Sequence, residues 1–217
     1  MIPAFCASTE EQPSDAARRL TAAANVMTEI MGIPERSIPQ DLLNKSECMV
    51  VVPGMKKGAF IVGGKYGRGY VACRKDGGVG WSAPGAIRVE GGSFGFQIGG
   101  AETDVVMLIM NHGGVEKLMK SRFTLGGDAS VAAGPVGRDT SAQTDALMNA
   151  QILTWSRQRG LFGGIALTGA TLREDRDANR ELYGQAYRNA DILSGKLASP
   201  PAAAPFVTAL NKYSSRK

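Results

Sequence analysis

The chain has 217 residues, of which 43% are hydrophobic, and a formal net charge of +5 at pH 7. This length and apolar content suffice for one substantial hydrophobic core, so we expect a single domain. No apolar run approaches the roughly 20 residues of a membrane-spanning helix, so we do not expect an integral membrane protein. The 28 glycines lack the three-residue period of collagen and predict turns and close backbone contacts instead.

The three cysteines, Cys6, Cys48 and Cys73, are too few for a complete disulfide framework. No Cys or His cluster has the spacing of a zinc site, and we predict no metal and no cofactor. Cys48 and Cys73 lie in apolar, strand-like surroundings and are expected to be small buried hydrophobic residues.

Residues 1–13 predict either a disordered N-terminus or the remnant of an export signal. Ala4 and Cys6 are small residues spaced as at a signal-peptidase site, and a polar stretch follows them. An ordinary frayed terminus explains them equally well, and the sequence leaves both alternatives open. The first alternative predicts a periplasmic or cell-envelope location.

Residues 14–31 predict an amphipathic helix, because Leu20, Ala24, Met27 and Met31 share one face and Ser14 or Asp15 can cap the start. A short second helix follows in 38–47. From Cys48 onward, β-branched runs separated by glycine-rich turns predict antiparallel strands. These runs are 48–53, 58–64, 69–75, 85–100 and 103–111.

The second half of the chain is less regular. We expect a short helix in 113–123, a helix-like stretch in 140–155 whose last part is ambiguous, and a hairpin-like region in 160–172. Short helices are expected in 175–187 and 190–197. The Pro- and Ala-rich tail, 198–217, is expected to be loosely ordered.

Residues 56–75 carry six basic side chains without one Asp or Glu. They are Lys56, Lys57, Lys65, Arg68, Arg74 and Lys75. A phosphate-binding P-loop requires a helix after the glycines, whereas this stretch lies between two strand-like runs. We therefore predict a hairpin with turn glycines at positive φ. In this hairpin Lys56 and Lys57 precede the first strand, Lys65 and Arg68 occupy the turn, and Arg74 and Lys75 end the second strand at the base. Its basic face is either simply solvated or meets phosphate groups, with Phe60, Tyr66 and Tyr70 available at the interface.

Catalytic motifs have little support. His112 is the only histidine and follows an apolar strand in a turn, and Ser82 lacks the second glycine of a nucleophile elbow. Asp175 and Asp177 resemble the start of a calcium loop, but Arg180 replaces its glycine, so they are better explained as acidic residues at a helix N-terminus. The two tryptophans are expected in the core. The sequence shows neither a recognition helix nor an aromatic RNA-binding strand, so we predict no nucleic-acid partner.

Several segments of the chain, in order, resemble the SYLF family, a lipid-binding domain also described as actin-binding in fungal proteins. The matching segments are IPQDLL (38–43), VVPGMKKGAFIVGGKYGRGYVACRKDGG (51–78), WSAPGAIRVEGGSFGFQIGGAETDVVMLIMN (81–111), FTLGGDASVAAGPVGR (123–138), SRQRGLFGGIALTGATL (156–172) and DANRELYG (177–184). The resemblance covers roughly residues 14–197, which we take as the domain. It implies a binding module rather than an enzyme.

The resemblance implies that eukaryotic relatives bind phosphoinositide-containing membranes through an N-terminal amphipathic helix and a basic surface. Arg18 and Arg19 occupy the cationic places of that helix, and two such charges alone predict only weak binding. The six basic residues of 56–75 would have to add to them. No SH3 or FYVE-type module is apparent, so we expect the stand-alone form, which in bacteria is usually exported.

We therefore predict an α+β domain with a glycine-rich antiparallel sheet curled toward a barrel or sandwich, flanked by the 14–31 helix, a 140–155 helix and others. The predicted function is non-enzymatic association with anionic phospholipid membrane surfaces. One alternative is a structural or protein-interaction module of the cell envelope with an unknown protein partner. A third is a hydrolase that uses Ser82 or His112.

Overall fold

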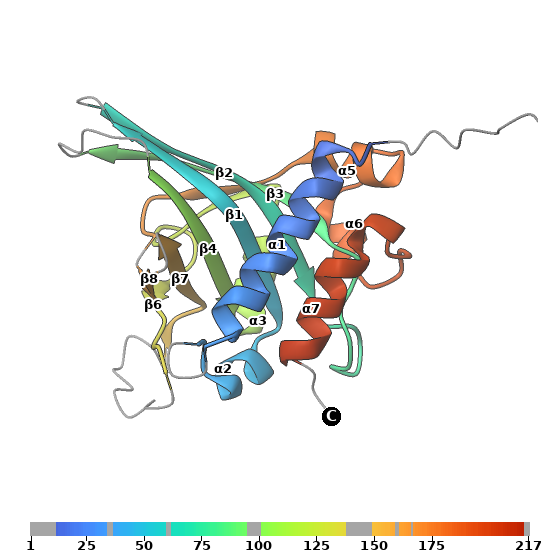
Figure 1. Cartoon of the computed structure of the whole chain (residues 1–217), viewed down its shortest axis with the longest axis horizontal. Coiled ribbons are helices and arrows are strands. Elements are labelled where there is room, and N and C mark those ends of the chain that lie inside the picture. The colour runs from blue at the N-terminus through green and yellow to red at the C-terminus, as the bar shows by residue number, and fades with distance from the viewer. Residues whose placement is uncertain are drawn as a thin grey trace, which may run out of the picture.

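A single curved β-sheet forms the architecture, with the N- and C-terminal helices packed on its outer face and the short helix 112–118 packed against its inner core (Figure 1). The computed structural model describes residues 12–33, 37–59, 62–94, 101–137, 149–158, 161–165 and 167–214. The helices are α1 (Asp15–Met31), α2 (Gln40–Lys45), α3 (His112–Leu118), α5 (Arg176–Tyr183), α6 (Asn189–Leu193), the 3-10 turn η2 (Pro201–Ala203) and α7 (Ala204–Ser214). The strands are β1 (Cys48–Ala59), β2 (Val62–Cys73), β3 (Gly85–Phe94), β4 (Ala101–Ile109), β5 (Arg122–Thr124), β6 (Val131–Ala133), β7 (Ile152–Gln158), β8 (Leu161–Gly164) and β9 (Thr171–Glu174). The predicted α+β class is confirmed.

The strand order is β5-β9-β3-β2-β1-β4-β7-β6, with β8 also paired to β7. Neighbouring strands are antiparallel, as predicted, except that β6 runs parallel to β7. The predicted hairpin in 160–172 is wrong, because β8 pairs with β7 whereas β9 pairs with β3 and β5 near the opposite end of the sheet. The chain between β8 and β9 therefore crosses from one side of the curled sheet to the other.

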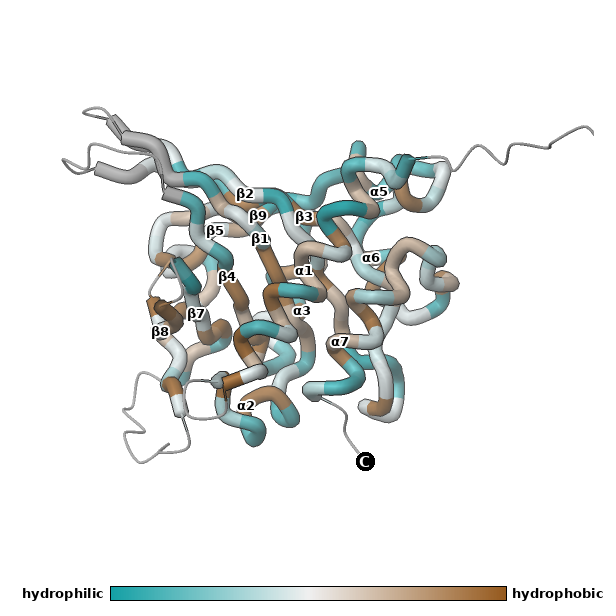
Figure 2. Tube along the Cα trace, in the orientation of Figure 1, coloured by the Kyte–Doolittle hydropathy of each residue, from teal (hydrophilic) through white to brown (hydrophobic). Residues whose placement is uncertain are grey.

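Strand β1 is buried on both faces, which explains its unbroken apolar run. Met49 and Val51 point outward into a core shared with α1 and α7, whereas Val50 and Val52 point into a second core inside the curl. This inner core joins Phe123 and other residues of the β5–β9 side to residues of β7, so the sheet closes around its own side chains. Figure 2 shows hydrophobic residues on the central strands where α1 crosses them.

Helix α1 forms where the periodicity predicts it. Ser14 caps its start, because the Ser14 hydroxyl accepts a hydrogen bond from the Ala17 amide at 3.2 Å. Leu20, Ala24 and Met27 are buried against the sheet, and Met31 packs at the edge of the same core. The helix therefore uses its apolar face for folding.

The C-terminal segment differs from the expected loose tail. Helix α7 packs beside α1 (Figure 1), with Phe206 and Leu210 fully buried. The ring of Phe206 lies 6.3 Å from the ring of Tyr70 on β2. Four apolar side chains spaced at 203, 206, 209 and 210 provide enough burial to order the segment despite its proline-rich start.

The predicted helix over 140–155 is wrong in its last part. Residues 138–148 lie outside the described residues, and Ile152–Gln158 is strand β7. β-branched and aromatic residues favour a strand here, and Trp155 fits because its indole N–H donates to the Pro135 carbonyl at 2.8 Å. Trp155 and Trp81 are both buried, as predicted.

Cys48 and Cys73 are buried but form a disulfide, which corrects their assignment as free thiols. The two residues are directly opposite each other where β1 begins and β2 ends. The pairing depends on strand register, and the register cannot be read from cysteine spacing alone. The disulfide joins the two central strands at their base.

The glycines of β2 are required for close packing and not for a turn. Gly63, Gly64, Gly67 and Gly69 lie within the strand, and Gly64, Gly67 and Gly69 have no positive φ, so the predicted turn role is wrong. A Cβ on Gly69 would lie 2.1 Å from the Val51 carbonyl oxygen. By contrast, a Cβ on Gly64 would meet no atom within 4 Å.

These two glycines give a matched test of packing in one strand. Gly69→Ala is expected to destabilise the fold by roughly 1–3 kcal/mol or more, because the backbone must move to remove the clash. Gly64→Ala should change stability by less than about 0.5 kcal/mol. Urea unfolding followed by circular dichroism measures both, and equal effects would contradict the packing role.

Candidate binding surface

The ends of β1 and β2 extend past the helices (Figure 1), and a bulge marks where this extension begins. The β1 register shifts between Val52 and Met55, around Pro53 and Gly54. Gly54 adopts φ +57°, and its amide donates to the Asp104 carboxylate at 2.9 Å. We call the paired residues beyond this bulge, 56–59 of β1 and 63–66 of β2, the ribbon tip.

The ribbon tip brings three of the predicted basic residues together. Lys56 is opposite Tyr66, and Lys57 is opposite Lys65. The Lys56 side chain is 75% exposed and Tyr66 is 47% exposed. The predicted positions of these lysines are therefore wrong. Lys56 and Lys57 lie within β1 and not before a strand, and Lys65 lies within β2 and not in a turn. Phe60 lies outside the described residues.

Glu102 of β4 is the acidic neighbour of the tip. Its carboxylate lies 3.9 Å from the Lys56 ammonium, and both side chains are more than 70% exposed. Such an exposed pair contributes little to stability and leaves the lysine free to exchange partners. Sequence reasoning missed Glu102, because only the β1–β4 register places it opposite Lys56.

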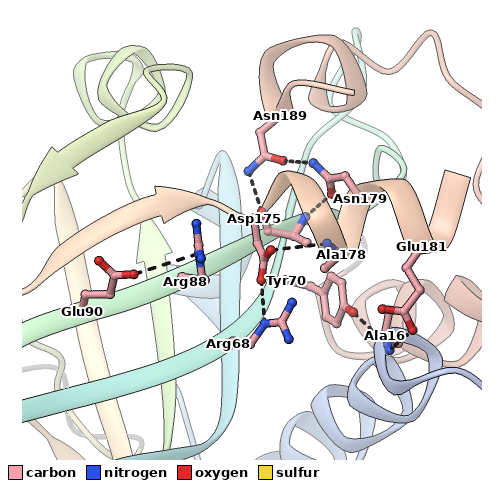
Figure 3. A network of polar contacts seen from close by, with 11 residues as sticks. Ala16, Arg68, Tyr70, Arg88, Glu90, Asp175, Ala178, Asn179, Glu181 and Asn189 are labelled. Carbon is pink, nitrogen blue, oxygen red and sulfur yellow. Dashed lines mark hydrogen bonds and ion pairs between the residues drawn. The ribbon is translucent and has the colours of Figure 1, made fainter. Parts of the chain in front are cut away.

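Arg68 is not part of the tip but of a buried polar network (Figure 3). Its Nε donates to the Asp175 carboxylate at 2.6 Å, and this hydrogen bond raises the Arg68 pKa. The Asp175 side chain is only 2% exposed, and its other oxygen caps α5 by accepting from the Ala178 amide at 3.3 Å. Asp175 is thus an acidic residue at a helix start, as predicted, while Arg68 is occupied by a structural partner.

Two asparagines complete this network between α5, α6 and β3. The Asn179 side-chain oxygen accepts from the Ala86 amide at 2.8 Å, and the Asn189 side-chain nitrogen donates to the Ala86 carbonyl at 3.0 Å (Figure 3). The two asparagines also bond to each other at 2.9 Å. The buried network therefore fixes α5 and α6 to the sheet.

Arg74 and Lys75 lie at the base of the ribbon, as predicted, but differ in exposure. Arg74 is buried, its guanidinium stacks over the Trp81 ring at 4.2 Å, and it donates to the Leu43 carbonyl at 3.1 Å. Lys75 is exposed. Arg74 therefore holds α2 against the sheet and presents no free charge at the surface.

Arg18 and Arg19 lie on α1, at the edge of an open groove of about 580 Å³ between α1 and strands β1 and β4. Arg18 is exposed and pairs with Asp15 on the same helix. The groove is charge-balanced as a whole, because three arginines and three carboxylates line it, and Arg157 bridges Glu29 of α1 and Asp104 of β4. The ribbon tip therefore carries less acidic compensation than the groove.

Burial controls the titration of the groups that join α1 and α5 to the sheet. It raises the pKa of Tyr70 to about 12, and it also raises the pKa of Tyr183. The Tyr70 hydroxyl donates to the Ala16 carbonyl at 2.8 Å (Figure 3), and the Tyr183 hydroxyl donates to the Pro84 carbonyl at 2.7 Å. Burial likewise raises the pKa of Asp104.

The serine considered in the hydrolase alternative is not available to a substrate. Ser82 is fully buried, and its hydroxyl accepts from the Cys73 amide and donates to the Ala83 carbonyl. His112 is the first residue of α3, 87% exposed and 3.4 Å from Glu116, while Asn111 caps the helix.

Among the described residues, no group of three or more His, Cys, Asp or Glu side chains could hold a metal ion. None of the helices in the described ranges is long and apolar enough to cross a membrane.

Asp175 and Asp177 give a matched test of the network. Asp175→Ala removes both the α5 cap and the partner of Arg68, and we expect it to lower the free energy of unfolding by roughly 2–4 kcal/mol. Asp177, on the same turn, is 80% exposed and pairs with the exposed Arg180, so Asp177→Ala should cost less than about 0.5 kcal/mol. Urea titration measures both, and equal losses would refute the assigned role of Asp175.

Comparison with known proteins gives one consistent family. Residues 90–213 match the family described as "Ysc84: Las17-binding protein actin regulator". The chain is 38% identical over 177 residues to an SH3 domain-containing protein of Schizosaccharomyces pombe, covering 80% of this chain and 41% of that protein. It is 34% identical over 210 residues to rat SH3 domain-containing YSC84-like protein 1, covering 94% of this chain and 61% of that protein.

A budding-yeast relative is named for a protein partner. The chain is 34% identical over 179 residues to LAS seventeen-binding protein 3 of Saccharomyces cerevisiae, covering 81% of this chain and 39% of that protein. The chain thus spans between about two fifths and three fifths of the length of these relatives. The family description names a binding protein and actin regulator, and the name of the yeast relative also refers to binding.

Proposed function

Because the chain belongs to the Ysc84 family, whose domain is also called SYLF, we propose that it is a non-enzymatic binding module that docks on anionic phospholipid surfaces through the ribbon tip. The observation that carries this proposal is the composition of the tip. Basic residues occupy both faces of the ribbon, because Lys56 shares one face with the exposed ring of Tyr66, whereas Lys65, the neighbour of Tyr66 in β2, projects from the other. An anionic surface attracts such lysines, by about 1 kcal/mol for each one close to the surface.

Helix α1 has a smaller role in this proposal than the family resemblance implies. Its apolar face is packed on the sheet, so in this fold it offers a membrane only polar side chains such as Arg18 and Arg19. These arginines line the groove that reaches the bulge and supplement the tip electrostatically, whereas Lys75 lies at the base of the ribbon, farther from the tip than the screening length of about 8 Å. Arg68 and Arg74 are occupied within the protein and contribute to folding.

Vesicle binding tests the tip. Wild-type protein is expected to co-sediment with vesicles containing phosphatidylserine in proportion to their anionic content, and less at high salt, because screening shortens the range of the attraction to about 8 Å at physiological ionic strength. The double variant Lys56→Gln/Lys65→Gln removes about 1 kcal/mol per lysine and should bind about thirty-fold more weakly.

Lys120→Gln/Lys196→Gln is the charge-matched control for that experiment. Both lysines are exposed and follow α3 and α6, away from the tip. The control should bind as wild type does. Equal losses in both double variants, or equal binding of wild type to neutral vesicles, would reject the ribbon tip as the docking surface.

A second candidate function is binding to a protein, favoured by the description of the family and by the name of the yeast relative. Actin filaments are the first ligand to test, since that description names an actin regulator. Co-sedimentation with filaments at physiological salt, without binding to anionic vesicles, would favour this candidate over the lipid one.

We also propose that the protein works in an oxidising compartment such as the periplasm or cell envelope. The supporting observation is the Cys48–Cys73 disulfide, since disulfides persist mainly outside the reducing cytosol. The location itself needs a direct measurement, such as fractionation of cells that produce the protein.

The disulfide gives its own prediction. In protein extracted without reductant, Cys48 and Cys73 should resist alkylation until they are reduced. Reduction should then lower the free energy of unfolding by about 2–4 kcal/mol, because the unfolded chain regains the freedom of the closed loop. Mass spectrometry and urea unfolding measure both effects, and alkylation of both thiols before reduction would contradict the oxidised state.

A further inference from the structure

Four arginines lie side by side across four adjacent strands. Arg68 of β2 is opposite Arg88 of β3, and Arg88 is opposite Arg173 of β9. Arg173 is in turn opposite Arg122 of β5. Residues that are directly opposite project from one face of a sheet, about 4.8 Å apart along the row. We call these four residues the arginine row.

The arginine row lies on the outer face of the sheet. Side chains alternate along a strand, so Arg68 shares the face of Tyr70, which packs in the outer core with α7. Exposure increases toward the β5 side, because the Arg68 side chain is 29% exposed whereas that of Arg173 is 45% exposed and Arg122 is exposed. A ligand would therefore reach the row from β9 and β5.

Two carboxylates compensate the row only in part. Asp175 pairs with Arg68 at 2.6 Å. Glu90 lies between Arg173 and Arg88, with its carboxylate oxygens 3.4 Å and 4.0 Å from their nitrogens (Figure 3 shows Arg88 and Glu90). Within the described part of the chain, no carboxylate pairs with Arg122. Two of the four positive charges are thus unmatched, although like charges opposite each other in a sheet are unfavourable.

Arg88 gives an independent indication that a ligand is expected here. Its Nε is buried and makes no hydrogen bond among the described residues, because the Glu90 carboxylate oxygen stands 4.0 Å from it, beyond hydrogen-bonding distance. A buried donor without a partner costs free energy, and an acceptor oxygen placed against the row would remove that cost. Hydroxyl groups lie on the same face, since Thr171 and Thr124 are opposite each other, two residues from Arg173 and Arg122.

We propose that the arginine row binds a compound with more than one phosphate group. A guanidinium fork matches the oxygens of a phosphate group in two parallel hydrogen bonds, and the spacing of the row suits neighbouring phosphates better than a single anion. Such groups occur in free polyphosphorylated compounds and in phosphorylated lipid headgroups, and the row would recognise the same chemistry in either. The inference goes beyond the proposed function, because it concerns another surface and needs no membrane.

Tripolyphosphate is the probe for this site. Isothermal titration should detect its binding to wild-type protein, with a rise in melting temperature, whereas sulfate at equal ionic strength should have little effect. Arg122→Gln/Arg173→Gln should bind at least tenfold more weakly while it keeps the wild-type circular dichroism spectrum, because it removes opposed like charges from an open face. Should that variant unfold, the exposed single variant Arg122→Gln should still bind several-fold more weakly.

Arg180→Gln/Arg188→Gln is the control with the same net charge. Both arginines are exposed and lie on or beside α5 and α6, outside the row. The control should bind tripolyphosphate as wild type does. Equal binding by the row variant, an equal loss in the control, or equal stabilisation by sulfate would overturn the proposal.

Vesicles identify the source of the phosphate groups. If the row variant also loses binding to vesicles containing diacylglycerol pyrophosphate, whose headgroup carries two neighbouring phosphate groups, and tripolyphosphate competes with them, the ligand is a lipid headgroup. If only tripolyphosphate binding is lost, it is a free phosphate compound. Lys56→Gln/Lys65→Gln should retain tripolyphosphate binding, so a failure of the ribbon tip and a failure of the arginine row give different results.

Discussion

Burial of β1 on both faces is the constraint on which the rest of the structure depends. A strand with apolar side chains on each face needs two covering layers, and one chain of this size supplies them in different ways. Outside, α1 and α7 cover Met49 and Val51. Inside, the sheet must curl until its own side strands cover Val50 and Val52. The curl of the sheet therefore follows from the apolar run at the start of β1.

The same constraint separates folding from binding along the length of the ribbon. As far as Val52, every side chain of β1 is in a core. After the bulge at Pro53 and Gly54, Met55 is the last core side chain of β1, and beyond it Lys56 and Tyr66 face solvent. Bulges bend a strand and change its twist, which directs the ribbon tip away from the helices. The polar end of the ribbon is available for a partner because no core depends on it.

Local patterns predict the parts of this fold that local interactions determine. The helical stripe of Leu20, Ala24 and Met27 and the cap at Ser14 place α1 correctly, and the glycine-separated apolar runs predict the antiparallel sheet. The errors concern contacts between distant residues. Glycines at 67 and 69 resemble turn residues, yet they are needed where β1 passes close to β2, and only the paired strand reveals this.

The candidate site follows the same division. The sequence shows six basic residues in 56–75, but their surroundings depend on contacts between distant segments. Some of them lie in the ribbon tip, whereas Arg68 is neutralised by Asp175 and Arg74 stacks on Trp81. Asp175 is more than 100 residues from Arg68 along the chain. The arginine row has no local signal at all, since its members come from four separate segments.

The Cys48–Cys73 disulfide also affects how the ribbon tip presents its charges. Hydrophobic burial normally sets the register of a strand pair, because a slip by one residue turns every apolar side chain toward water. The tip has polar residues on both faces and lacks this safeguard. A covalent bond at the base, together with the buried residues above it, fixes the alignment for the whole pair. Lys56 and Tyr66 are thereby kept on one face and Lys65 on the other, so that the tip is a surface of defined pattern instead of a basic strand free to slide.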